Sequence, residues 1–149
     1  MLRIRSNKLY NITMDHLSKK KRSWNMSRIY SKNTLPEKKA RSILHKMGYR
    51  FCLHKKSLPG KPDIVLPKYR TVIFVHGCFW HRHKGCRDTT TPKTNTAFWE
   101  AKFTYNMQRD LRHRRALKKL GWKTIIIWEC ELDKEEKLKN RIKRLLIQA

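Results

Sequence analysis

The sequence predicts an α/β protein in which helices flank a mixed β-sheet. Two short segments, residues 71–75 and 123–128, are rich in β-branched and aromatic residues and have the length of buried strands. Three segments, 34–47, 96–120 and 132–147, repeat apolar residues at the three- and four-residue spacing of amphipathic helices. At 149 residues the chain is long enough for one domain with its own hydrophobic core.

Residues that typically begin or end a helix also bound the predicted helices 34–47 and 96–120. The first begins near Thr34, a capping residue, which is followed in the first turn by Pro36 and Glu37. Gly48 ends this helix and Gly121 ends the long one, since glycine readily takes the left-handed conformation that closes a helix.

Two shorter extended segments precede the strand 71–75. Residues 49–54 form the first, and residues 63–66 form the second, which follows the turn-rich segment 57–62. The resulting order, α-β-β-β-α-β-α, predicts one mixed sheet with helices on its faces.

The chain is strongly basic. Its 37 lysines and arginines against 11 acidic residues give a formal net charge of +26, which favours a nucleic-acid partner. Composition alone would also suit a ribosome-associated or membrane-surface protein. Because no apolar run has the length of a membrane span or the position of a signal peptide, we expect an intracellular protein. Its four cysteines would then stay reduced, which favours metal binding over disulfides.

The N-terminal segment is basic and has little apolar periodicity. We expect residues 1–22 to be a disordered arm, followed by a single domain over residues 23–149. Within that domain, residues 23–34 interleave Trp24 and Met26 with basic residues. Such a segment could become ordered on DNA with an apolar side chain wedged between bases.

A group of thiols and an imidazole predicts a metal site. Three of its members lie within nine residues after a predicted strand and the fourth follows the last strand: Cys78, His83, Cys86 and Cys130. Three thiolates and one imidazole form a tetrahedral zinc set, and we expect a structural zinc that joins the two loops. The alternative is a set of reduced, buried cysteines. We expect the remaining cysteine, Cys52, to lie in the core.

Carboxylates are scarce, so those at the start of a strand or a helix are informative. Asp63 follows a proline at the start of a strand, where a carboxylate can hold a divalent metal against a phosphate. A turn residue is the alternative. Glu37 stands in the first turn of a helix, where its charge by itself would stabilise the helix N-terminus.

One face of the long helix is apolar except for two polar residues. This face comprises Trp99, Phe103, Asn106, Asp110, Leu117 and Leu120. A buried carboxylate needs a partner, and we expect Asp110 to pair with a histidine of the segment 76–83 and to fix its tautomer. An exposed Asp110 paired with an arginine is the alternative.

Aromatic residues in the same region suit contacts with bases. Phe79 and Trp80 are adjacent in a polar loop, where both cannot easily enter one core, and aromatic faces amid many cations suit base stacking. Trp99 suits core packing almost as well.

These motifs together resemble the very short patch repair (Vsr) endonuclease family. The similarity covers residues 23–132, and its most specific part joins a PGxPD turn to the string HGCFWH. The segments that carry it are SLPGKPD at 57–63, VIFVHGCFWH at 72–81, Phe98-Trp99, Gly121-Trp122 and Trp128-Glu129-Cys130. The resemblance implies a restriction-endonuclease-like core. It also implies a Mg²⁺-dependent enzyme that nicks DNA 5′ of the thymine in T·G mismatches, which arise when 5-methylcytosine is deaminated.

The resemblance further implies roles for individual residues. Asp63 and the backbone carbonyl of Val75 correspond to the ligands of the catalytic metal. His81 corresponds to the histidine that handles the attacking water, Asp110 to the acid behind it, and His76 to a second active-site histidine.

Other positions of the family are also matched. Glu37 corresponds to an active-site glutamate, and the three cysteines with His83 correspond to the ligands of a structural Zn²⁺. The positions that contact or intercalate between bases correspond to Met26, Phe79, Trp80, Trp99, Lys102 and Asn106. The chain departs from the family at Val75, where threonine is frequent, and in the loop from His83 to Cys86, which is one residue longer.

By the same resemblance we expect a monomer in the bacterial cytoplasm, associated with the nucleoid, that acts on double-stranded DNA containing a T·G mismatch. Mismatch-repair proteins and a cytosine-5 methyltransferase system are its candidate partners. Two alternatives remain open. One is a related restriction-type or recombination nuclease with a different DNA substrate, and the other is a non-catalytic, zinc-stapled DNA-binding module.

Overall fold

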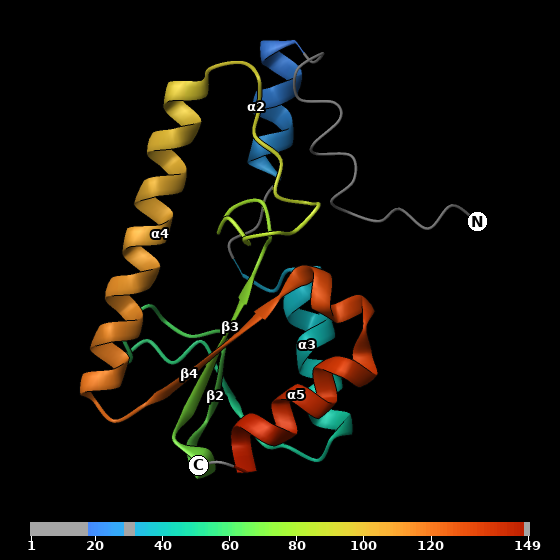
Figure 1. Ribbon diagram of the computed structural model, residues 1–149, viewed down its shortest axis with the longest axis vertical. Coiled ribbons are helices and arrows are strands. Elements are labelled where there is room, and N and C mark those ends of the chain that lie inside the picture. Colours follow the sequence, from blue (N-terminus) through green and yellow to red (C-terminus); the bar gives the residue numbers. More distant parts are fainter. Residues whose placement is uncertain (1–17, 29–31, 148–149) are drawn as a thin grey trace.

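A mixed four-stranded sheet forms the centre of the protein (Figure 1), whose computed structural model describes residues 18–28 and 32–147. The strand order is β1-β2-β3-β4, in which the pairs β1–β2 and β2–β3 are antiparallel and β3–β4 is parallel. The strands are β1 (Cys52–Leu53), β2 (Ile64–Leu66), β3 (Thr71–His76) and β4 (Lys123–Trp128). The predicted mixed sheet and the order of its strands along the chain are confirmed.

Helices cover both faces of this sheet. Helices α3 (Leu35–Lys46) and α5 (Glu135–Ile147) lie beside each other on one side, and the long helix α4 (Thr96–Lys119) lies on the other (Figure 1). Helix α2 (Lys19–Ser27) precedes them, and two short 3₁₀ helices, η2 (Pro67–Tyr69) and η3 (Glu129–Asp133), follow β2 and β4.

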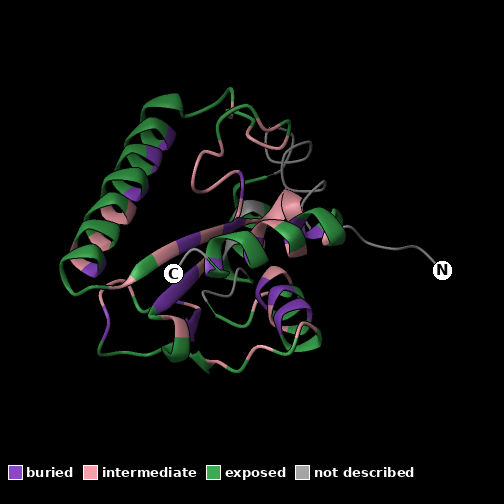
Figure 2. Cartoon of the chain, turned by 60° about the horizontal axis from the view of Figure 1, so that its bottom comes forward, coloured by how far each residue is buried: buried purple, intermediate pink, exposed green. Residues whose placement is uncertain are grey.

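The apolar strands supply side chains to a core on each face. Ile73 and Ile125 belong to the larger core, which includes residues of α3 and α5, whereas Val72 belongs to a smaller core with Leu117 of α4. Successive strand residues point to opposite faces, so a strand covered on both sides is apolar without interruption. Helix α4 differs from the strands, because its buried residues line one side of the helix (Figure 2).

Two helix boundaries differ from the prediction. Helix α2 begins at Lys19, inside the segment 1–22 that we expected to be disordered, because Lys and Arg favour helix and the Ser18 hydroxyl accepts a hydrogen bond from the Lys21 amide. Residues 1–17 of that arm lie outside the described residues. The last α-helix begins at Glu135, because Glu131 accepts the Trp128 amide and closes the separate turn η3.

Two residues predicted to be buried are exposed. Cys52 lies on the two-residue edge strand β1, which pairs only with β2, so its thiol is exposed rather than in the core. Leu120 follows the last residue of α4 and has left the apolar face of the helix, and its side chain is 52% exposed. Among the described residues, no helix has both the length and the apolar character needed to cross a bilayer.

Candidate active site and metal centre

A cleft of about 1050 Å³ opens where β3 ends. Its wall includes parts of α3, the end of β3, the loop that follows β3, and the middle of α4. The cleft brings together most of the residues singled out in the sequence: Glu37, Asp63, Val75, His76, Phe79, Trp80, His81 and Asp110.

Asp63 is fixed against the backbone of the neighbouring strand. The pairing of β2 with β3 ends at the pair Ile64 and Ile73, so Val75 lies beyond it. The amide of Val75 donates a hydrogen bond of 2.8 Å to Asp63 Oδ2. The carboxylate therefore lies beside the stretch of backbone that was predicted to share a metal with it.

The surroundings of Asp63 suit a bound cation. Burial, together with a smaller effect of the nearby Glu37, raises the pKa of Asp63 to about 6, although the hydrogen bond from Val75 opposes the shift. A bound cation stabilises the ionised form of a buried carboxylate that lies beside a second carboxylate. Carboxylate oxygens are also the ligands that Mg²⁺ prefers. The donor set present thus fits a divalent metal.

His81 and Asp110 form the predicted pair. Nδ1 of His81 lies 2.5 Å from Asp110 Oδ2, and the guanidinium of Arg109 donates to the other carboxylate oxygen at 3.1 Å. Both partners that the sequence offered for Asp110 are therefore in place. Burial raises the pKa of Asp110, but the hydrogen bond and charge of His81 outweigh it, so that this pKa lies below its ordinary value.

His76 supports the ring of His81. The two imidazoles stack with their centroids 3.7 Å apart and their planes inclined by 12°. His76 is buried, and burial together with the neighbouring His81 lowers its pKa to about 3, so that it is neutral near pH 7. The stack holds the His81 ring in a fixed orientation at the wall of the cleft.

Glu37 faces the cleft although it lies in the first turn of a helix. It is 4% exposed and accepts hydrogen bonds from the Thr34 hydroxyl, the Asn33 amide and the Arg41 guanidinium. Its carboxylate also lies in one group with His54 and Asp63, whose ligand atoms are all within 4.8 Å of one another.

Arg41 and His54 were missed in the sequence. Arg41 stands one helical turn after Glu37, a spacing at which an acid and a base lie side by side, and this signal could have found it. His54 follows a two-residue strand and reaches the cleft by tertiary packing alone, so the sequence held no signal for it.

The four predicted zinc ligands converge at the ends of β3 and β4. Because these strands are parallel, their ends meet at one edge of the sheet. His83 Nδ1 lies 3.6 Å from Cys78 Sγ and 3.4 Å from Cys130 Sγ. The ligand atoms of these residues and of Cys86 all lie within 4.8 Å of one another.

The chemistry of this group fits a thiophilic cation. Burial raises the pKa of Cys78 and of Cys130, and thiols of the same group add to the shift in each. A bound cation reverses such shifts, because it stabilises the thiolates. Three sulfurs and one imidazole nitrogen match the donors of structural zinc.

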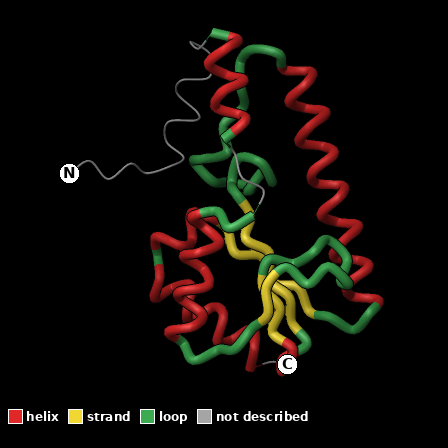
Figure 3. Tube along the Cα trace, turned by 180° about the vertical axis from the view of Figure 1, so that it is seen from behind, coloured by secondary structure: helices red, strands yellow, loops and turns green. Residues whose placement is uncertain are grey.

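The loop residues 77–95 connect β3 to α4 (Figure 3), and the aromatic side chains of this loop pack against that helix. Phe79 and Trp80 are half-buried, and their ring centroids lie 5.4 and 5.8 Å from that of Trp99, which is 7% exposed. Buried Asn106 donates a hydrogen bond of 3.1 Å to the Trp80 carbonyl. Both rings therefore pack against Trp99, and neither Phe79 nor Trp80 belongs to the two hydrophobic cores of the sheet.

Two further residues, Lys102 and Met26, were predicted to contact DNA. Lys102 is exposed on α4. Met26 lies on α2, but its side chain is outside the described part of the structure.

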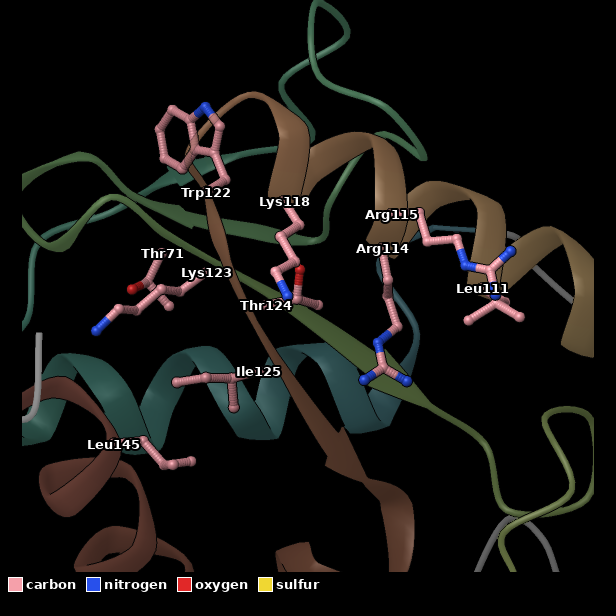
Figure 4. A pocket seen from close by; sticks show the side chains of 10 residues that line it. All are labelled: Thr71, Leu111, Arg114, Arg115, Lys118, Trp122, Lys123, Thr124, Ile125 and Leu145. Atoms are coloured by element: carbon pink, nitrogen blue, oxygen red, sulfur yellow. The ribbon is translucent and has the colours of Figure 1, made fainter.

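A second, smaller cleft lies at the opposite end of β3 and β4 (Figure 4). It measures about 460 Å³ and combines apolar side chains with several cations of α4 and β4. Its lining includes Thr71, Leu111, Arg114, Lys118 and Lys123, and none of the site residues predicted from the sequence. The two clefts therefore occupy opposite ends of the same pair of strands.

Comparison with known proteins shows the family of the chain. A family model described as DNA mismatch endonuclease Vsr matches residues 14–88. The chain is 48% identical over 132 residues to the Type II nicking enzyme V.XorIIP of Xanthomonas oryzae pv. oryzae, a match that covers 89% of this chain and 96% of that protein. It is 46% identical over 117 residues to the DNA mismatch endonuclease Vsr of Escherichia coli, with 78% and 74% covered.

One solved structure has a similar fold. The catalytic domain of the homing endonuclease I-Bth0305I matches with a TM-score of 0.52 and 20% identity, covering 78% of this chain and 97% of that domain. This similarity supports the predicted restriction-endonuclease-like core. From these relatives, the chain belongs to the family of the DNA mismatch endonuclease Vsr, and it is a DNA endonuclease.

Proposed function

We propose that this endonuclease nicks DNA on the 5′ side of the thymine in T·G mismatches and requires Mg²⁺. One observation carries the proposal: a buried carboxylate, Asp63, and an imidazole oriented by an acid, His81, line the same cleft. Hydrolysis of a phosphodiester needs a site for a metal and a group that accepts a proton from water, and the two residues supply one each.

Asp63 and the carbonyl of Val75 would hold the metal against the scissile phosphate. When bound there, Mg²⁺ would polarise the phosphoryl oxygen and stabilise charge on the leaving oxygen. The amide of Val75 keeps the Asp63 carboxylate in place for this role through the hydrogen bond at 2.8 Å.

His81 would accept the proton of the attacking water. Its Nδ1 is engaged by Asp110, which leaves Nε2 as the nitrogen that can act as the base. Asp110 fixes the tautomer and stabilises the imidazolium that forms, and the stacked, neutral His76 restrains the ring.

Selectivity for a mismatch would come from the aromatic side chains. Phe79, Trp80 and Trp99 form one cluster, in which Phe79 and Trp80 line the cleft and would enter a base step while buried Trp99 supports them. A mismatched pair opens at lower free-energy cost than a matched pair, so the same wedge favours T·G over T·A. We place Lys102 and Asn106 among the residues that contact the bases.

A Zn²⁺ ion held by the three cysteines and His83 would have a structural role. Cys78 and His83 flank the segment that bears Phe79, Trp80 and His81. A closed four-ligand site there would fasten both the wedge and the base to the end of β4.

Nicking of end-labelled duplexes that contain either T·G or T·A at one position tests this function. With Mg²⁺ we expect one cut, 5′ of the mismatched thymine, and an uncut T·A duplex. Equal cutting of both duplexes would instead favour a related nuclease with another substrate. Cutting of neither, with binding retained, would leave a DNA-binding module.

The origin of the substrate also suggests where the enzyme acts. Because T·G mismatches form when 5-methylcytosine is deaminated, we propose that it works on cytoplasmic, nucleoid DNA that a cytosine-5 methyltransferase has modified. Mismatch-repair proteins would be its partners there.

A further inference from the structure

A partly buried arginine lies next to the acidic groups of the active-site cleft. The Nη2 atom of Arg41 donates at 2.9 Å to Glu37 Oε2 and lies 2.9 Å from His54 Nε2. Its Nη1 atom donates at 2.8 Å to the side-chain oxygen of Asn33. The Arg41 side chain is 15% exposed, so the charge of the guanidinium is poorly screened by water.

These contacts define the charges of the group. An arginine can only donate, so His54 Nε2 is the acceptor in this contact. Glu37 and Asp63 supply two negative charges, and Arg41 supplies one positive charge. These three charged side chains together therefore carry a net charge near −1, where the two carboxylates alone would carry −2.

The position of the guanidinium is well fixed. The guanidinium contacts three side chains, those of Asn33, Glu37 and His54. Two of these residues, Asn33 and His54, have the left-handed backbone conformation, with φ values of 55° and 46°. Residues other than glycine adopt this conformation at a cost in free energy, and such strain is common at functional sites. The arrangement keeps the cation beside the carboxylates rather than in solvent.

We propose that Arg41 is a positioning residue that lowers the affinity of the DNA-free enzyme for its divalent metal, so that the metal and DNA bind cooperatively. This inference rests on the proposed role of Asp63 as a metal ligand. A divalent cation meets one excess negative charge in the free protein, and the phosphates of bound DNA supply the remainder. By linkage, the metal raises the affinity for DNA by the same factor as DNA raises the affinity for the metal.

Calorimetric titration with Ca²⁺ tests the proposal, since Ca²⁺ takes the same class of oxygen ligands. The zinc-loaded, full-length protein is titrated alone and in complex with a T·G duplex, and the duplex alone provides the blank. Arg41→Met removes the charge, Arg41→Lys keeps it, and Arg41→Gln removes it while keeping a donor for Glu37. The matched control is Lys39→Met, which loses the same charge on the same helix from an exposed side chain paired with Asp133.

We expect Arg41→Met and Arg41→Gln to raise the Ca²⁺ affinity of the DNA-free protein by roughly fivefold or more, because a close cation has been removed. The enhancement by DNA should shrink by the same factor. Arg41→Lys and Lys39→Met should stay within about twofold of the unsubstituted protein.

Two results would overturn the proposal. Unchanged or weaker Ca²⁺ binding in folded Arg41→Gln protein would reduce Arg41 to a structural support of Glu37. An equal rise in Lys39→Met would assign the effect to net charge alone. If Arg41→Met does not fold, Arg41→Gln alone decides. Failure of the underlying function looks different: Asp63→Asn would then bind Ca²⁺ as well as the unsubstituted protein does.

Discussion

At the scale of single residues, the proposed mechanism depends on the pairing of His81 with Asp110. The carboxylate contacts Nδ1 at 2.5 Å and leaves Nε2 for the water. Asp110→Asn keeps the shape of the side chain but removes its charge and can present a donor to Nδ1. We expect single-turnover nicking of a T·G duplex to fall by about 10²-fold or more, since proton transfer typically contributes 10²–10⁴. Glu100→Gln, at an exposed acid of the same helix, should nick normally. A small effect of Asp110→Asn would remove the pair from the mechanism.

The raised pKa of Asp63 predicts how metal binding depends on pH. Burial brings this pKa to about 6, and only the ionised carboxylate binds the metal. Below about pH 6, Ca²⁺ affinity measured by calorimetry should fall by about tenfold per pH unit, because a proton competes at this residue. Affinity that is constant from pH 7 to pH 5 would contradict the assignment of Asp63.

The same shift predicts a change in stability with pH, with its sign fixed by proton binding. Between the ordinary value of 3.8 and about 6, the folded state binds more protons at Asp63 than the unfolded state does. The contribution of Asp63 to the free energy of unfolding therefore decreases as pH rises through this window, and it is constant above it. Urea unfolding at several pH values should show a shallower decrease in Asp63→Asn than in the unsubstituted protein. Parallel curves for the two proteins would contradict this prediction.

At the scale of elements, the loop that carries Asp63 is pressed against α4. Gly60 has φ +75°, and a Cβ atom added there would lie 2.7 Å from Nδ1 of His113. Gly48 also has a left-handed conformation, with φ +86°, but no atom lies within 4 Å of an added Cβ. Both alanine substitutions strain the backbone by about 1 kcal/mol, and only Gly60→Ala adds overpacking of about 1–3 kcal/mol. Urea unfolding should therefore show a larger loss for Gly60→Ala, and equal losses would contradict the close contact.

The elements show which parts of the fold could be predicted and why. Strands β3 and β4 were predictable because each is covered on both faces, so that consecutive residues in the middle of each strand are apolar. Cys52 was misplaced because burial at the edge of a sheet depends on which neighbour a short strand has, and the local sequence does not record that. Leu120 was misplaced because the helix ended one residue before it.

Some residues of the candidate site could also be predicted from the sequence, and others could not. Asp110 was predictable, since a lone acid on an apolar helix face demands a partner. The grouping of Glu37, Asp63 and His54 was not, because three separate segments bring these residues together only through tertiary packing. Arg41 could have been predicted from its position one helical turn after Glu37, although in a chain with 37 basic residues an arginine by itself carries no signal.

At the scale of the whole molecule, the group of cysteines joins the two parallel strands beyond their ends. Purified protein should contain about one equivalent of zinc per chain, and a structural site of this kind contributes directly to folding. Cys130→Ser removes the ligand that follows β4, so we expect loss of bound zinc and a lower Tm. Exposed Cys52→Ser should retain both. Protein without zinc, or a Cys130→Ser variant with unchanged Tm, would refute the site.

The central claim is that Asp63 and His81 act on one phosphodiester in one cleft, and Asp63→Asn tests it most directly. Binding to a T·G duplex and single-turnover nicking should be measured on the same preparation with Mg²⁺ present. Asn keeps the size of the side chain but cannot supply a charged ligand, so we expect binding to persist and nicking to disappear. Nicking at the rate of the unsubstituted enzyme would contradict the account.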